Sequence, residues 1–343
     1  MTNAVSSQLP AESSLAQHLL VMIMGVAQTA VLCTAAQLGL ADHLKDGPKS
    51  VAALAEATRT HPPTLTRLMS VLTHLGLCAE IAPGQFTCTP LGALLQTDAP
   101  HSLRHIAMLM GSEPLGHAWP HLVESVRTDT SAFERVFAMN LYSYFQQHPA
   151  VLAVFQQAMS DLSTQEGLAI REAYDFAGCS MVVDVGGGRG GLLAILLQAF
   201  PSLNAILMDV PAVVEGAQAM FDAEPLRERC QLVGGDFLAA VPAGGDLYIL
   251  KRVLVDRTDD EAHTLLTNIR RAMAPQGRVL VADPDSRSPY GKLYDMMMLM
   301  AFGSRLRPDA EMQALFAQTG FTLTRTIETR AVTTLRLFEG VPA

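Results

Sequence analysis

The chain has 343 residues, of which 49% are hydrophobic and 17% are charged, so it is long enough for two domains and too apolar for a disordered protein. Lys and Arg together number 24 against 33 Asp and Glu, and the formal net charge of -9 disfavours a surface built for nucleic acid or for an anionic membrane. Five scattered cysteines, with no C-x-x-C pair, indicate neither a disulfide framework nor a zinc site, and we expect a cytoplasmic protein that holds no metal.

The first hundred residues are predicted to form a small helical domain. Residues 19–41 are apolar but carry several polar side chains, so we interpret them as a helix buried against protein rather than as a membrane span. Such a helix needs partners on most sides, which leads us to expect a homodimer. Helical patterns over 51–75, followed by β-like runs at 78–81 and 85–88 around a Pro-Gly turn, are typical of a winged-helix domain. DNA binding is disfavoured because the presumed recognition region carries few cations.

The remainder of the chain divides into a helical segment and an alternating one. In residues 101–177, prolines separate helical patterns from one another, and no clear strand is predicted. Later, strand-like apolar runs alternate with helical segments, which predicts a mostly parallel sheet with helices on both faces. The expected strands are 181–185, 205–208, 230–233, 246–250 and 278–282, with two more after Gly320. We therefore predict segments 1–100, 101–177 and 178–343.

A glycine-rich turn, VDVGGGRGG, follows the first predicted strand of this sheet. Glycine is needed where the backbone turns tightly and a ligand approaches closely. The spacing also satisfies the dinucleotide fingerprint, but Asp184, just ahead of the glycines, suits the cationic end of S-adenosylmethionine better than a pyrophosphate. Asp209, at the end of the next strand, is expected to hydrogen-bond a ribose in either case. Asp236 and Phe237, after the third strand, suit adenine, with the alternative that Asp236 is only a turn acid.

The runs VDVGGGRGGLL, LMDVPAVVEGA, GGDFL and DLYILKRVL, in this order, resemble the S-adenosylmethionine-dependent small-molecule O-methyltransferases of the caffeate and hydroxyindole type, including bacterial natural-product members. The resemblance covers nearly the whole chain. It implies a Rossmann-like class I methyltransferase domain after a winged-helix-like dimerisation domain, a homodimer, and a small-molecule acceptor in specialised metabolism. It also implies that S-adenosylmethionine, with S-adenosylhomocysteine as product, is bound by Asp184, Gly186, Gly188, Asp209, Val210, Asp236, Phe237 and Lys251.

The chain departs from this family at its acid–base residues. Members usually carry a histidine general base in a stretch LHDW, and Val255 stands in its place. A glutamate that supports the histidine corresponds to Leu306, and a third, acidic partner corresponds to Asp283. In lacking the histidine, the chain resembles the anthracycline-tailoring branch of the family.

Methyl transfer remains chemically feasible without the histidine. A positioned base contributes roughly 10²–10⁴-fold, whereas alignment of the reacting atoms supplies roughly 7–11 kcal/mol. We take Asp256 and Arg252 as the catalytic candidates, with the alternative that Asp256 is an ordinary surface acid at the start of the next helix. We expect Arg257 on a solvated face. The leading hypothesis is O-methylation of an aromatic or polyketide-like hydroxyl, mainly by proximity and orientation. The alternative is a non-methylating role for bound S-adenosylmethionine in hydroxylation, decarboxylation or cyclisation.

The predicted substrate residues come from segments where the family lines its pocket. Phe155 and Met159 form one helical stripe, which core packing explains equally well. The candidates for substrate binding are Tyr142, Tyr144, Phe155, Met159, Met297 and Arg305.

Overall fold

The structure of the protein is a computed structural model that describes residues 12–222 and 226–343. The chain forms two compact units, Met1–Gly116 and His117–Ala343. The helical residues 117–177 therefore belong to the same unit as the sheet that follows them. One helix, α8 (Glu113–Ala118), crosses the boundary between the units.

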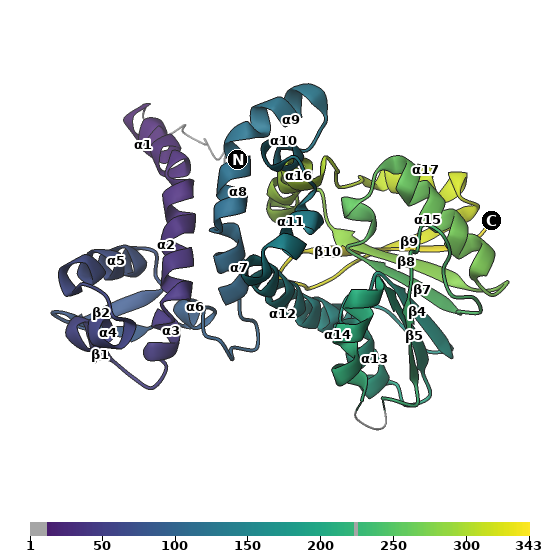
Figure 1. Cartoon of the computed structure of the whole chain (residues 1–343), viewed down its shortest axis with the longest axis horizontal. Coiled ribbons are helices and arrows are strands. Elements are labelled where there is room, and N and C mark those ends of the chain that lie inside the picture. The colour runs from purple at the N-terminus through teal and green to yellow at the C-terminus, as the bar shows by residue number, and fades with distance from the viewer. Residues whose placement is uncertain (1–11, 223–225) are drawn as a thin grey trace, which may run out of the picture. The chain divides into compact units, whose positions relative to one another are not determined.

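The first unit is helical and carries a small antiparallel wing in the strand order β1-β3-β2 (Figure 1). Ser50 begins α4 by accepting a hydrogen bond from the Ala53 amide, and two prolines begin α5. The expected winged-helix arrangement is present, with β1 as an additional strand too short to show a sequence period. The helices are α1 (Glu12–Ile23), α2 (Gly25–Gln37), α3 (Leu40–His43), α4 (Val51–Thr58), α5 (Pro62–His74), α6 (Pro90–Ala93) and α7 (Arg104–Met110), and the strands are β1 (Lys49–Ser50), β2 (Cys78–Ala82) and β3 (Gln85–Cys88).

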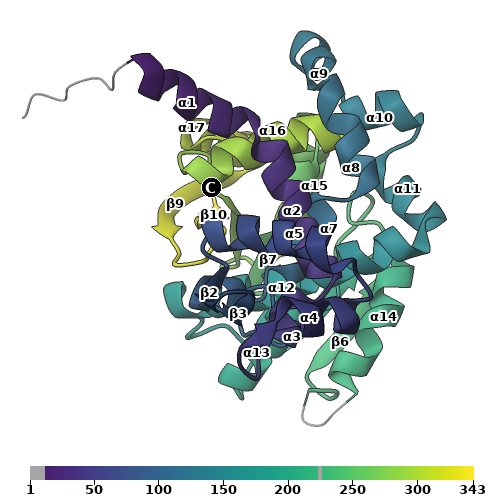
Figure 2. The same ribbon diagram turned by 90° about the vertical axis from the view of Figure 1, so that its left-hand side faces the viewer.

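The apolar N-terminal segment forms two helices rather than the single predicted one. α1 and α2 meet at Met24 and are bent by 47°, a change of direction visible in Figure 2. No single helix of the described residues is long and apolar enough to cross a membrane, although this bent pair passes a test of length and composition. Large apolar side chains along it are exposed, and Val26 is 80% accessible. Cys33, Ala35 and Ala36 of α2 are buried within this unit, so only the part of the segment up to Val26 lacks the partners that the sequence predicts for it.

The second unit is built on a seven-stranded sheet in the order β6-β5-β4-β7-β8-β10-β9. The five neighbouring strands β6, β5, β4, β7 and β8 are parallel, and β10 runs antiparallel to both β8 and β9. The five strands predicted between residues 181 and 282 are confirmed within two residues, and the two expected after Gly320 are also present. The strands are β4 (Met181–Val185), β5 (Asn204–Asp209), β6 (Cys230–Gly234), β7 (Leu247–Lys251), β8 (Arg278–Pro284), β9 (Phe321–Glu328) and β10 (Leu335–Pro342).

Helices cover both faces of this sheet, because successive strand side chains point to opposite sides (Figure 1). Val182 and Leu207 belong to the core shared with α12, α13 and α14, whereas Val183 and Met208 belong to the core shared with α15 and α17. The helices are η1 (Trp119–His121), α9 (Leu122–Thr128), α10 (Ala132–Phe137), α11 (Leu141–Gln147), α12 (Pro149–Ala173), α13 (Gly191–Ala199), α14 (Pro211–Phe221), η2 (Leu254–Asp256), α15 (Asp259–Ala272), α16 (Pro289–Phe302) and α17 (Asp309–Gln318).

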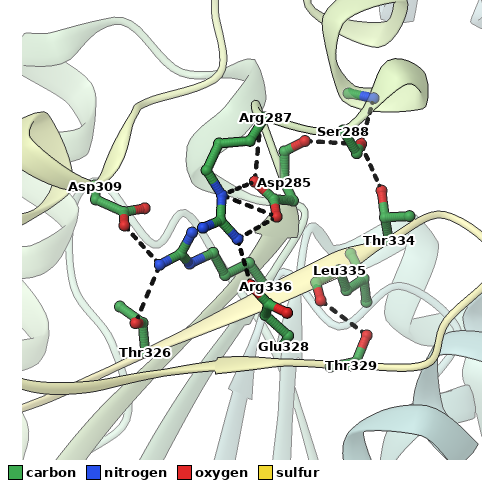
Figure 3. Close-up of polar contacts among 11 residues, drawn as sticks. Asp285, Arg287, Ser288, Asp309, Thr326, Glu328, Thr329, Thr334, Leu335 and Arg336 are labelled. Carbon is green, nitrogen blue, oxygen red and sulfur yellow. Dashed lines mark hydrogen bonds and ion pairs between the residues drawn. The ribbon is translucent and has the colours of Figure 1, made fainter. Parts of the chain in front are cut away.

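The start of α16 is fixed by polar contacts with the end of β8 and with the connection between β9 and β10 (Figure 3). The Ser288 hydroxyl accepts from the Gly291 amide at 2.8 Å, and it lies 2.7 Å from the Thr334 hydroxyl. Arg287 bridges the carboxylates of Asp285 and Glu328, each at 2.6 Å. These contacts set the position of the helix that carries Met297.

Gly291→Ala is expected to lower the free energy of unfolding by roughly 1–3 kcal/mol. A Cβ at Gly291 would lie 1.9 Å from the Asp285 carbonyl oxygen, so the capped start of α16 would have to shift. The matched control is Gly216→Ala in α14, where the nearest atom would be the Arg189 Nε at 3.9 Å. This control is expected to gain up to about 1 kcal/mol from helix propensity. Urea unfolding followed by circular dichroism measures both, and equal effects would contradict the expectation.

Candidate active site

The carboxyl ends of β4, β5, β6 and β7 bring the predicted cofactor residues to one edge of the sheet. β4 lies between β5 and β7, so the strand order reverses there. In open sheets of this kind, ligands bind at the carboxyl ends of the strands beside such a reversal. Asp184, Asp209 and Lys251 all lie at this edge, at the ends of β4, β5 and β7.

The glycine loop after β4 has a left-handed backbone that leaves room on one side. Gly186 and Gly188 have φ of +71° and +61°. A Cβ at Gly186 would lie 2.7 Å from the Val253 side chain, whereas a Cβ at Gly188 would meet nothing within 4 Å. The loop therefore packs tightly against the segment after β7 and is open at Gly188, as close approach of a ligand requires.

Asp184 is a fully buried carboxylate beneath this loop. Neither of its oxygens has a hydrogen-bond partner among the described residues. Burial raises the pKa of Asp184 to about 7, against the opposing effect of Lys251. A buried carboxylate without a partner is costly, so the position fits the ammonium group of a bound cofactor.

Two further acids lie where the adenosine half of the cofactor is expected. Asp209 accepts hydrogen bonds from the amides of Gly188 at 2.8 Å and Val210 at 2.7 Å. Burial raises the pKa of Asp209, while these two amides oppose the rise. The exposed Asp236 accepts from the Leu238 amide at 2.8 Å, so the turn role accounts for one of its oxygens. Its other oxygen, the half-buried Phe237 beside it and Asp209 fit a ribose and an adenine ring.

A buried ion-pair cluster that the sequence did not reveal holds the end of β7. Glu166 of α12 accepts from the Arg252 Nε at 2.8 Å and from the Thr333 hydroxyl at 2.6 Å, and its carboxylate lies 3.5 Å from the Lys251 Nζ. Although burial alone would raise the pKa of Glu166, Arg252 and Lys251 hold it below its usual value. The guanidinium of Arg252 also lies 5.0 Å from the ring centre of Tyr294. Arg252 is thus engaged in structural contacts. The one signal for Glu166 was its place in a helix beside Gly167, which packs closely on α13.

The two positions at which the chain departs from the family lie in one apolar cluster. Val255, Met298 and Leu306 are buried together, and Tyr294, Met297 and Phe302 pack around them. An apolar cluster thus stands where the sequence comparison places a base and its support.

Asp256 follows Val255 and lies beside the predicted substrate residues. Its carboxylate accepts from the Tyr142 hydroxyl at 2.7 Å and forms an ion pair with the Arg257 Nε at 3.4 Å. Burial raises the pKa of Asp256, against the opposing effect of Arg257. The ring of Tyr142 contacts the rings of Phe155 and Phe302, with centroids 6.2 and 5.4 Å away.

Other predicted residues make their contacts elsewhere. Tyr144 stacks on His148 with 3.8 Å between ring centroids. Arg305 is exposed and pairs with Asp259 and Glu311, so it does not join the cluster around Val255. Met159 is half-buried on α12. Across residues 12–222 and 226–343, no group of three or more His, Cys, Asp or Glu side chains is arranged to hold a metal ion.

The prediction that Arg257 lies on a solvated face is wrong. Its side chain is only 24% exposed, and its guanidinium lies 5.3 Å from the ring centre of Phe237. The side chain packs inward because the ring and the Asp256 carboxylate both attract the cation. Asp283, the third acidic position, is also buried, and burial raises its pKa to about 7 against the effects of Arg307 and Arg252.

Comparisons with known proteins agree with this geometry. Residues 119–322 match the O-methyltransferase domain family, and residues 20–98 match the O-methyltransferase dimerisation domain. Phenazine O-methyltransferase PhzM of Lysobacter antibioticus is 37% identical over 92% of this chain and 93% of that protein. Phenazine-1-carboxylate N-methyltransferase of Pseudomonas aeruginosa is 33% identical over 94% and 97%.

A solved relative connects the family to its cofactor. The structure of CalO1, a methyltransferase in calicheamicin biosynthesis, was determined in its S-adenosylhomocysteine-bound form and matches with a TM-score of 0.87 and 34% identity, covering 97% of this chain and 99% of that one. The chain therefore belongs to the O-methyltransferase family with an N-terminal dimerisation domain, and it is an S-adenosylmethionine-dependent methyltransferase.

Proposed function

We propose that this methyltransferase acts on a hydroxyl of an aromatic or polyketide-like small molecule in specialised metabolism, mainly by holding donor and acceptor in the reactive orientation. The observation that carries the mechanism is the apolar cluster of Val255, Met298 and Leu306. Aliphatic side chains accept no proton, so the acceptor oxygen has to ionise by another route. The phenazine-modifying relatives support a flat aromatic acceptor.

The cofactor side is assigned to the edge of the parallel strands. S-Adenosylmethionine supplies an electrophilic methyl group when it is bound. Asp184 and Lys251 are proposed to hold its amino-acid half, and Gly186 and Gly188 to bring the backbone close to it. The adenosine half is assigned to Asp209, Val210, Asp236 and Phe237.

The acceptor side is assigned to the aromatic and thioether side chains near η2. Tyr142, Phe155 and Met297 offer flat or adaptable apolar surfaces, and Met159 extends the stripe of Phe155 along α12. Asp256 accepts a hydrogen bond from the Tyr142 hydroxyl and follows Val255 directly in the sequence, so we propose that it orients the acceptor hydroxyl. Orientation of this kind supplies more of the barrier reduction than a base does.

Three other candidates are retained with less support. The contacts of Tyr144 with His148 and of Arg305 with Glu311 weigh against direct roles in substrate binding. Arg252 donates to Glu166 from both its Nε and its Nη2, which weighs against a catalytic role. The non-methylating alternative is not favoured, because the relatives named above are methyltransferases.

We also propose that the protein is a homodimer. The matched dimerisation domain supports this, as does the exposed apolar surface of α1 and α2. A large exposed apolar patch is costly in water unless another chain covers it.

Val255→His combined with Leu306→Glu is expected to install a base where the wild type has none. Turnover of phenols with a pKa near 10 should rise, by up to roughly 10²–10⁴-fold, because few such molecules are ionised at neutral pH. Phenols with a pKa below about 7 should gain little, because they are already ionised. Transfer of labelled methyl to a graded series of phenols measures the difference. Leu306→Glu alone is the control and should give no gain. A uniform gain across the series would contradict the proposal.

Met22→Glu combined with Val26→Glu is expected to convert the dimer to a monomer, because both exposed apolar side chains lie in the segment assigned to the interface. Light scattering during size exclusion should show twice the chain mass for the wild type and one chain mass for the variant. Gln313→Glu with Ala317→Glu, at exposed positions of α17, is the charge-matched control and should remain a dimer. A wild-type monomer at micromolar concentration would overturn the expectation.

A further inference from the structure

Arg257 lies among residues assigned to the adenosine half of the cofactor. Its guanidinium is 5.3 Å from the centre of the Phe237 ring. It is also close enough to Asp209 to oppose the rise in the pKa of that carboxyl, which burial causes. Phe237 and Asp209 are the residues proposed for adenine and ribose. One cation therefore lies against the residue proposed for adenine and acts on the carboxyl proposed for ribose.

The donors of Arg257 are not consumed by strong contacts within the protein. Its Nε is buried and makes no hydrogen bond to any of the described residues. The nearest carboxylate oxygen, on Asp256, lies 3.4 Å from this atom, and the other oxygen of Asp256 is taken by Tyr142. An arginine carries five N–H donors in a planar fork, so this one retains donors for a ligand.

The backbone of Arg257 is held by a second arginine. Arg307 is buried, with 3% of its side chain exposed. It donates to the carbonyl oxygens of Leu254 at 2.6 Å and Arg257 at 3.0 Å, on either side of Val255 and Asp256. It also pairs with Asp259 at 2.8 Å. The guanidinium of Arg307 thus holds the backbone on both sides of this turn and fixes the direction in which the Arg257 side chain leaves η2.

We propose that Arg257 forms part of the adenosine-binding surface and that Arg307 is the residue that positions it. A guanidinium stacks on aromatic faces and donates to ring nitrogens and ribose oxygens, a combination that lysine does not reproduce. The inference rests on the assignment of Phe237 and Asp209 proposed above.

The test compares two ligands by isothermal titration. S-Adenosylhomocysteine has both halves of the cofactor, whereas 5′-methylthioadenosine keeps the adenosine and lacks the amino acid. Arg257→Ala is expected to weaken both by a similar factor of about 10, the loss expected for one guanidinium–ring contact. Arg257→Gln, which retains a planar polar group, serves if the alanine variant does not fold. The control is Arg330→Ala, at an exposed arginine between β9 and β10, and it should leave both affinities unchanged.

The outcomes separate this inference from the proposed cofactor site. Unchanged binding by the Arg257 variants, or a loss confined to S-adenosylhomocysteine, would overturn the role of Arg257 while leaving the site intact. Failure of the wild type to bind either ligand would instead overturn the residue assignment and this inference together. An equal loss of affinity in Arg330→Ala would show that the effect comes from the overall charge of the protein, and it would overturn the inference as well.

The positioning role of Arg307 is tested by a double-mutant cycle. Arg307→Lys keeps the charge but not the fork, and it is expected to weaken S-adenosylhomocysteine about 5-fold in the wild type and not at all in the Arg257→Ala background. Arg336→Lys is the matched control and should leave the affinity unchanged, because Arg336 is also a buried arginine and its partners Asp309 and Thr326 are not residues assigned to the cofactor. The same loss from Arg307→Lys in both backgrounds would show a merely structural role and overturn the positioning.

Discussion

The ion pair between Glu166 and Arg252 is the contact on which this edge of the sheet depends. Both side chains are almost fully buried, and removal of either partner would leave an uncompensated charge in the interior. Arg252 has φ of 58°, a left-handed conformation that is unfavourable for any residue with a side chain. Glu166 therefore stabilises the bend by which the chain leaves β7. From this bend, Val253 reaches the glycine loop, and the turn η2 begins with the next residue.

The sequence allowed the second unit to be predicted well because its signals are local. Apolar runs of strand length alternate with helical periods, and the glycines of residues 186–190 mark a turn that few other residues tolerate. The break between α1 and α2 was not predictable from composition, since both sides of Met24 are equally apolar. The role of Glu166 depends on Arg252, which is 86 residues away in the sequence. The inward direction of Arg257 depends on Phe237, about 20 residues away, as well as on the adjacent Asp256. No local pattern encodes the two distant pairings.

The cluster around Val255 illustrates how a polar constellation can be lost without loss of the fold. Apolar side chains of similar volume often replace a buried ion pair at no cost in stability, because desolvation of the charges is avoided. Val255 and Leu306 are buried together with Met298 in an apolar cluster of this kind. Asp283, the third acidic position, is buried, and one of its oxygens has no hydrogen-bond partner among the described residues.

Asp184 and Asp283 make the folded protein bind protons more tightly than the unfolded chain does. Burial raises the pKa of each from 3.8 to about 7, so each carboxyl is protonated in the native state over a range in which the unfolded chain is ionised. The stability that the protonated forms contribute is complete below about pH 4 and declines as the pH rises through 7. Conformational stability and the charge at the cofactor edge are thus linked within the physiological range. A cation that binds beside Asp184 favours its ionised form and releases a proton to solvent.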